Sequence, residues 1–92
     1  MNILTVCGMG SGSSLILKMN VDEILEAESR DAEVEACDIG SVGAHNADLI
    51  LATRDFKDPL EEYDVDKIFL GNVVDKVAIK QELDTYFEEK GN

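Results

Sequence analysis

The sequence predicts an α/β protein in which short strands alternate with helices. Apolar segments such as NILTV and DLILA suit strands with both faces covered, and longer segments between them have the period of amphipathic helices. Glycine and serine residues cluster where one element should give way to the next. We expect strands at residues 2–6, 34–39, 48–52 and 67–70, and helices at residues 13–29, 54–64 and 75–90.

The same alternation predicts the topology. Crossover connections between parallel strands are right-handed, so the simplest arrangement is a four-stranded parallel sheet in the order 2-1-3-4, with helices on both faces. This is a three-layer fold of the flavodoxin-like or Rossmann-like kind. In that order, the loop after the first strand lies at the switch point of the sheet, where open α/β folds bind ligands.

Each of the two longer helices has a predicted core-facing side. The first helix has Ser13 or Ser14 as a candidate N-cap. Its apolar residues at helical spacing are Leu17, Val21, Ile24 and Leu25. In the closing helix, we expect an inward side made of Ile79, Leu83 and Tyr86, with Val77 and Phe87 left unassigned.

Length and charge restrict the classes of function. The chain has 92 residues, so we expect one domain spanning residues 1–92. Its net charge of −12 argues against nucleic-acid binding, because there is no basic stripe to meet phosphates. Residues 1–20 contain a single charged residue, Lys18, whereas residues 21–40 contain eight acids and one base. The loop after the first strand therefore lacks nearby carboxylates in sequence, and an anion should be tolerated there.

The two cysteines, Cys7 and Cys37, do not form a metal or redox motif. There is no CxxC and only one histidine, His45, which excludes the common zinc spacings and the thioredoxin motif. We see no secretory signal and no apolar run long enough for a membrane span. We therefore expect a cytoplasmic protein with reduced thiols.

The segment CGMGSGSS, residues 7–14, has the features of a phosphate-binding loop. Glycines let the backbone turn sharply, so that successive N–H groups and the start of the next helix can surround an anion. The same field should favour a thiolate, so we expect a depressed pKa for Cys7 and nucleophilic attack on phosphorus. The expected phosphate contacts are Gly8, Met9, Gly10, Ser11, Gly12, Ser13 and Ser14.

Comparison with known phosphate-binding loops argues against nucleotide binding and against phosphatase activity. The Walker pattern fails because the loop has no lysine, and the dinucleotide pattern fails because its last glycine would fall on Ser13. In the Cx5R loop of low-molecular-weight phosphatases, the arginine position also falls on Ser13. Without that arginine to stabilise the transition state, hydrolysis of a phosphocysteine should be slow. A loop of this kind would instead carry a phosphoryl group and release it to a partner.

Residues 7–25, CGMGSGSSLILKMNVDEIL, closely resemble the segment after the active cysteine in IIB components of the bacterial phosphoenolpyruvate-dependent sugar phosphotransferase system. The similarity is greatest to the ascorbate-type branch, and the segments VEACDIG (34–40) and ADLILAT (47–53) also resemble that branch. The resemblance covers roughly the first 53 residues, whereas residues 54–72 show little similarity.

The resemblance implies a function. Cys7 would accept a phosphoryl group from a phosphohistidine of a IIA component and pass it to a sugar bound by the membrane IIC component. The activity would be that of a protein-Nπ-phosphohistidine–sugar phosphotransferase, placed at the inner face of the membrane through IIC. No metal or organic cofactor would be required, because such transfer depends on positioning and electrostatics.

Several other residues are candidates for supporting roles. For Cys37 a buried structural role is favoured over a redox role, and for His45 a solvated loop position is favoured over a second phosphoryl site. Arg54 and Asp55 follow the third strand and are weaker candidates for contact with the phosphate. Exposed apolar residues near an active loop suggest partner docking, for which the candidates are Met9, Leu15 and Met19.

Two alternatives to a phosphoryl carrier remain open from the residues alone. One is a thiol-dependent phosphatase or arsenate reductase of the low-molecular-weight phosphatase type, against which Ser13 at the arginine position argues. The other is a binding module for a phosphorylated metabolite that forms no covalent intermediate. The sequence does not identify the sugar.

Overall fold

The computed structural model describes residues 1–8 and 13–90. Its strands are β1 (Asn2–Cys7), β2 (Glu33–Asp38), β3 (Leu49–Thr53) and β4 (Asp66–Leu70). Its helices are α1 (Ser13–Ala27), α2 (Lys57–Leu60) and α3 (Lys76–Glu89), with 3-10 turns η1 (Ile39–Ala44) and η2 (Arg54–Phe56).

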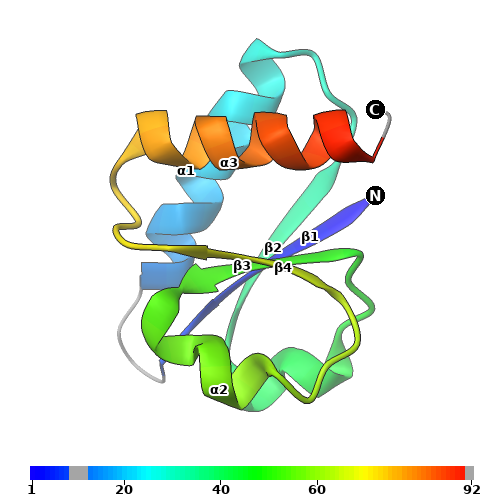
Figure 1. Cartoon of the computed structure of the whole chain (residues 1–92), viewed down its shortest axis with the longest axis vertical. Coiled ribbons are helices and arrows are strands. Elements are labelled where there is room, and N and C mark those ends of the chain that lie inside the picture. Colours follow the sequence, from blue (N-terminus) through cyan, green and yellow to red (C-terminus); the bar gives the residue numbers. More distant parts are fainter. Residues whose placement is uncertain (9–12, 91–92) are drawn as a thin grey trace.

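The four strands form one parallel sheet in the order β2-β1-β3-β4, which confirms the predicted topology. β1 is therefore an inner strand, and Val6 is paired with Cys37 on one side and with Ala52 on the other. All four strands point the same way, so their carboxyl ends share one edge of the sheet. Figure 1 shows α1 and α3 both beginning at this edge, at the left of the view.

Two apolar clusters cover the two faces of the sheet. α1 and α3 pack on one face, and η1 and α2 lie on the other (Figure 1). The α1/α3 core contains the buried residues Ile3, Leu17, Val21, Ile24, Leu25, Val34, Leu49, Leu51, Ile68, Leu70, Ile79, Leu83 and Phe87. The opposite core contains Leu4, Val6, Val42, Ile50, Ala52 and Leu60. Alternation along β1 thus divides its side chains between the two layers.

The predicted inward sides of α1 and α3 are confirmed, and the structure decides the two residues of α3 that were left unassigned. All four apolar residues predicted for α1 are buried, as are Ile79 and Leu83 in α3. Phe87 is also buried there, and Tyr86 is partly buried and packs against the same core, whereas Val77 is 68% exposed. Tyr86 and Phe87 follow Leu83 by three and four residues, so both lie on its face of the helix.

Polar contacts hold the helices of the α1/α3 layer in place. The side-chain amide of Asn20 in α1 donates to the carbonyl of Val73, just before α3, at 2.7 Å. At the other end of α3, the Tyr86 hydroxyl donates to the carboxylate of Asp66 at 2.8 Å, and Lys90 pairs with the same carboxylate. These two hydrogen bonds hold the pKa of Asp66 below its usual value.

The connections differ from the sequence-based expectation in two places. The turn predicted at residues 40–46 is mostly the 3-10 turn η1, and the helix predicted at residues 54–64 is limited to η2 followed by the short α2. β1 also extends one residue beyond its predicted end, because Cys7 pairs with Asp38 of β2. Cys7 therefore belongs to the strand.

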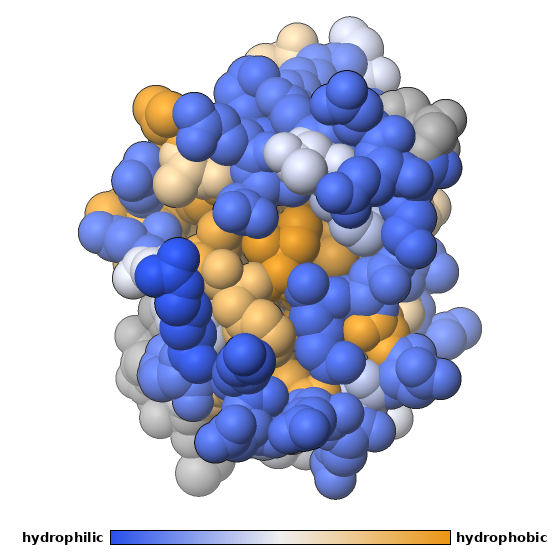
Figure 2. All heavy atoms as spheres, viewed as in Figure 1, coloured by the Kyte–Doolittle hydropathy of each residue, from blue (hydrophilic) through white to orange (hydrophobic). Residues whose placement is uncertain are grey.

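The surface is largely hydrophilic, as expected for a net charge of −12 (Figure 2). Hydrophobic side chains interrupt it in the centre and at the left of the view. Exposed apolar residues include Val74, just before α3, and Val77 in the first turn of α3. Within residues 1–8 and 13–90, the structure contains no helix with the length and apolar character needed to cross a bilayer.

Two leucines of α1 provide a matched test of the core. Leu17 is fully buried and Leu15 is 56% exposed. We expect Leu17→Ala to lower the free energy of unfolding by about 3 kcal/mol, because it leaves a cavity in the α1/α3 core. Leu15→Ala should change it by less than about 0.5 kcal/mol, measured by urea unfolding. Equal losses for the two variants would contradict this assignment of the buried face.

Candidate functional site

Cys7 lies at the carboxyl end of an inner strand, at the edge of the sheet where α1 begins. It pairs with Asp38 of β2 and is buried. By strand alternation its side chain shares a face with Ile3 and Thr5, the face that α1 covers. The predicted placement of the cysteine between a strand and a helix N-terminus is confirmed.

Ser14 is the nearest identified partner of the thiol. Its hydroxyl oxygen lies 2.9 Å from the Cys7 sulfur, and the contact is buried. Ser14 stands in the first turn of α1, where backbone N–H groups lack partners within the helix and add partial positive charge. The sulfur therefore faces both a hydroxyl and the positive end of a helix, which is a setting that favours an anion.

Thr5 completes this arrangement from within β1, and sequence reasoning missed it. Its hydroxyl donates to the backbone carbonyl of Ser14 at 2.7 Å and lies 3.3 Å from the carbonyl of Glu35. The side chain is fully buried. The sequence feature that could have indicated it is the single hydroxyl residue among the apolar residues of β1.

The other predicted loop residues divide into two groups. Gly8 follows Cys7, and a Cβ added there would lie 3.4 Å from the ring of Phe56, so this aromatic side chain stands over the start of the loop. Ser13 is the first residue of α1. Four predicted phosphate contacts lie outside the described residues, namely Met9, Gly10, Ser11 and Gly12.

Arg54 and Asp55 follow β3 at the same edge of the sheet, but neither has a contact with Cys7 among those identified. A Cβ on Gly71 would lie 3.2 Å from the Arg54 guanidinium, which therefore leans toward the end of β4. β4 is on the side of β3 opposite to β1. The Asp55 carboxylate accepts a hydrogen bond from the Thr53 hydroxyl.

Cys37 is a partly buried thiol on the opposite face of the sheet. It pairs with Val6 and packs against the cluster beneath the sheet, as the favoured structural role predicts. Burial, together with the nearby Asp38, Cys7 and Glu35, raises its pKa from 9.0 to about 11. At neutral pH this thiol stays protonated and is a poor nucleophile.

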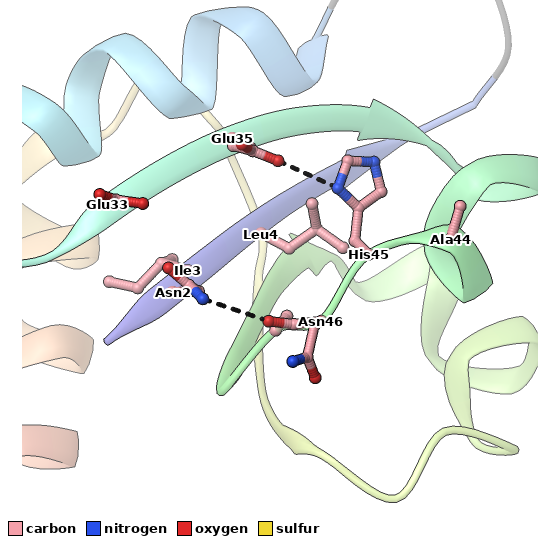
Figure 3. A pocket seen from close by; sticks show the side chains of 9 residues that line it. Asn2, Ile3, Leu4, Glu33, Glu35, Ala44, His45 and Asn46 are labelled. Carbon is pink, nitrogen blue, oxygen red and sulfur yellow. Dashed lines mark hydrogen bonds and ion pairs between the residues drawn. The ribbon is translucent and has the colours of Figure 1, made fainter.

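His45 lies near the start of β1, at the end of the sheet opposite to Cys7. Its Nδ1 is 3.0 Å from the carboxylate of Glu35, so it is paired with that acid as well as partly exposed. Both residues border a cavity of about 290 Å³ near the start of β1, which Figure 3 shows with Asn2 and Asn46. The cavity is separate from the thiol site.

Apolar side chains are exposed near the first turns of α1. Leu15 is 56% and Met19 57% exposed, which confirms that neither belongs to the core. Ile16 is exposed as well, although the sequence analysis did not single it out. Across the parts of the chain that the structure describes, no three histidine, cysteine or acidic side chains are arranged to hold a metal ion.

Fold and site together define a class: a doubly wound α/β protein whose inner first strand ends in a cysteine beside the N-terminus of the next helix. Residues 2–85 match the family described as "PTS system, Lactose/Cellobiose specific IIB subunit". Because the match covers most of the chain, the protein belongs to this family of IIB subunits of the sugar phosphotransferase system.

Part of the chain is also similar to individual curated proteins. The chain is 43% identical over 53 residues to the ascorbate-specific PTS system EIIB components of Escherichia coli O157:H7, Shigella flexneri and Salmonella typhi. These alignments cover 55% of this chain and 52% of each relative, so the chain spans about half the length of the curated relatives it matches.

A solved structure shares the fold over nearly the whole chain. It is the lactose-specific IIB component domain of the phosphotransferase system from Streptococcus pneumoniae, with a TM-score of 0.62 and 17% identity. The superposition covers 96% of this chain and 95% of that one. At this identity the likeness shows the fold.

The raised pKa of Cys37 predicts a low reactivity that alkylation can measure. In a Cys7→Ser variant, Cys37 should react with iodoacetamide at pH 8 roughly a hundredfold more slowly than an unperturbed thiol, because its thiolate fraction is lower. Its rate should rise steeply only above pH 10. A pH profile with its midpoint near 9 would contradict the proposed effect of burial and the neighbouring acids.

Proposed function

We propose that the protein is a phosphoryl carrier and that Cys7 holds the phosphoryl group. The observation that carries the proposal is the position of the Cys7 sulfur, 2.9 Å from the Ser14 hydroxyl at the start of α1. This arrangement supplies what a phosphocysteine needs, a nucleophilic sulfur with donors beside it. Membership of the IIB family agrees with this use of the site.

The first step is transfer from a phosphohistidine of a IIA component. The Cys7 thiolate attacks phosphorus, so the S–P bond forms as the N–P bond breaks, and the electron pair returns to the donor imidazole. The Ser14 hydroxyl and backbone N–H groups of the loop then face the phosphoryl oxygens. In this proposal the loop donors are Gly8 to Ser14, including the residues outside the described parts.

The second step is transfer to a sugar hydroxyl. The S–P bond breaks as a new O–P bond forms, the hydroxyl gives up its proton, and the thiolate of Cys7 is restored. The Arg54 guanidinium leans toward Gly71, and Ser13 occupies the position at which a phosphatase loop has its arginine. Both observations support a carrier over the phosphatase alternative.

We propose an ascorbate-like sugar as the acceptor, bound by a membrane IIC component. The support is the 43% identity to ascorbate-specific components, which is confined to about half of the chain. The proposal places residues 1–92 as one IIB-type domain in the cytoplasm, at the inner face of the membrane through IIC. The phosphocysteine is the only covalent intermediate, and the mechanism uses no metal or organic cofactor.

The exposed apolar side chains of α1 are the proposed docking surface for the IIA component. Leu15 and Met19 lie within two turns of Ser14, and Met9 is proposed to join them from the loop. Their exposure at the Cys7 edge would let a partner cover them while its histidine approaches the sulfur. Methionine suits such a surface because its flexible side chain adapts to different partners.

Phosphorylation of the purified chain tests the carrier proposal. With phosphoenolpyruvate, the general phosphotransferase proteins and an ascorbate-type IIA, intact-mass spectrometry should detect one added phosphoryl group. Cys7→Ser should abolish this label because it removes the sulfur nucleophile. Cys37→Ser and His45→Gln are the matched controls and should both keep it.

The alternatives give different results in the same assay. Label that persists in Cys7→Ser but disappears in His45→Gln would move the site to the histidine. If no variant is ever labelled, the carrier proposal is wrong. Turnover of an aryl phosphate that depends on Cys7 would support the phosphatase alternative, and metabolite binding undiminished in Cys7→Ala would support a binding module.

The docking proposal predicts a change in apparent affinity for the donor. Met19→Ser should raise the KM for phosphorylated IIA roughly tenfold, because it removes apolar contact area at the docking surface. Ala27→Ser, at the far exposed end of the same helix, is the control and should leave the KM unchanged. Alkylation of Cys7 should proceed normally in both variants. Equal KM values would place the docking surface elsewhere.

A further inference from the structure

We propose that Thr5 is a positioning residue for Cys7 and acts through Ser14. Its hydroxyl holds the first turn of α1 where the Ser14 hydroxyl meets the Cys7 sulfur. The inference rests on the proposed role of Cys7 as the phosphoryl carrier. It assigns a function to a side chain that never touches the phosphoryl group.

The burial of Thr5 requires an explanation that packing does not provide. The side chain is fully buried near the middle of β1, between apolar neighbours. A buried hydroxyl is costly unless it forms hydrogen bonds, and valine would give the same shape without that cost. The hydroxyl donates at 2.7 Å to the Ser14 carbonyl and lies farther from the Glu35 carbonyl, at 3.3 Å. The contact with α1 is thus the shorter of the two.

Thr5, Ser14 and Cys7 form a closed arrangement. Thr5 and Cys7 are two residues apart in β1, so their side chains point to the same face. Thr5 contacts the backbone carbonyl of Ser14, and Cys7 contacts its hydroxyl. Ser14 is therefore held at two points by a single strand, which restricts both the position of the helix turn and the direction of its hydroxyl.

The position of the Ser14 hydroxyl matters because it can form a hydrogen bond with Cys7 both as a thiol and as a thiolate. In the thiol state it accepts the S–H, and in the thiolate state it rotates and donates its own proton to sulfur. A hydrogen bond donated to the charged form favours that form. If the helix turn moved away, the thiolate would lose this donor, and the fraction of reactive sulfur at neutral pH would fall.

Alkylation of Cys7 as a function of pH tests the inference in a Cys37→Ser background, where a single thiol remains. Thr5→Val should shift the profile to higher pH and slow alkylation at pH 7 roughly three- to tenfold, because fewer molecules hold a thiolate. Thr5→Ser restores the hydroxyl and should keep the original profile. If Thr5→Val leaves the profile unchanged, or if Thr5→Ser shifts it equally, the inference is wrong.

A double-mutant cycle separates positioning from general loss of structure. Ser14→Ala should itself shift the profile, and adding Thr5→Val should produce little further shift, because the donor that Thr5 positions is already absent. Additive shifts would show that Thr5 acts independently of Ser14. Alkylation needs no IIA component or sugar, so failure of the phosphorylation assay would overturn the carrier function without deciding this test.

Proton NMR of the unaltered protein keeps the inference testable if Thr5→Val does not fold. The Thr5 hydroxyl proton should exchange slowly with water, and its resonance should shift when Cys7 is alkylated, because the two residues share Ser14. A hydroxyl proton that exchanges rapidly, or that does not respond to alkylation, would contradict the proposed contact.

Discussion

The structure depends on the burial of β1 between two strands and two helical layers. Pairing with β2 and β3 satisfies its backbone on both sides, and its side chains alternate between the two apolar clusters. An inner strand of a parallel sheet has little freedom to shift, because a slip of one residue would exchange its buried faces. Cys7, at the end of this strand, takes its place from the same pairing, through Asp38 of β2.

The two cysteines lie on opposite faces of the sheet and have different surroundings. Cys7 faces α1, where a hydroxyl and a helix N-terminus stand beside the sulfur. Cys37 is one register position away on the neighbouring strand, on the other face, where burial and nearby acids raise its pKa to about 11. The same residue type thus lies beside a hydroxyl and a helix N-terminus on one face and stays protonated on the other.

Carrier and hydrolase chemistry differ in what surrounds the sulfur. A hydrolase needs a positive group over the phosphoryl oxygens and an acid or base for water, whereas a carrier needs a stable intermediate that a partner can reach. Here the cation that follows β3, Arg54, leans toward β4, and Ser13 occupies the position at which a phosphatase loop has its arginine. Neutral donors and exposed apolar side chains at the same edge fit a protein that passes its group onward.

The sequence by itself determined the element order, the 2-1-3-4 sheet, the buried face of α1 and the placement of Cys7 before a helix, because periodicity and local glycine chemistry are encoded in short stretches. Only the tertiary structure decided that Phe87 is buried and Val77 exposed, that Phe56 stands over Gly8 and that Arg54 leans toward Gly71. The contacts of Ser14 with Thr5 and Cys7 also belong to this second group. They join a strand to the helix that follows it, and no local pattern encodes how close the Thr5 hydroxyl comes to the Ser14 carbonyl, or the Cys7 sulfur to the Ser14 hydroxyl, because only packing brings these groups together.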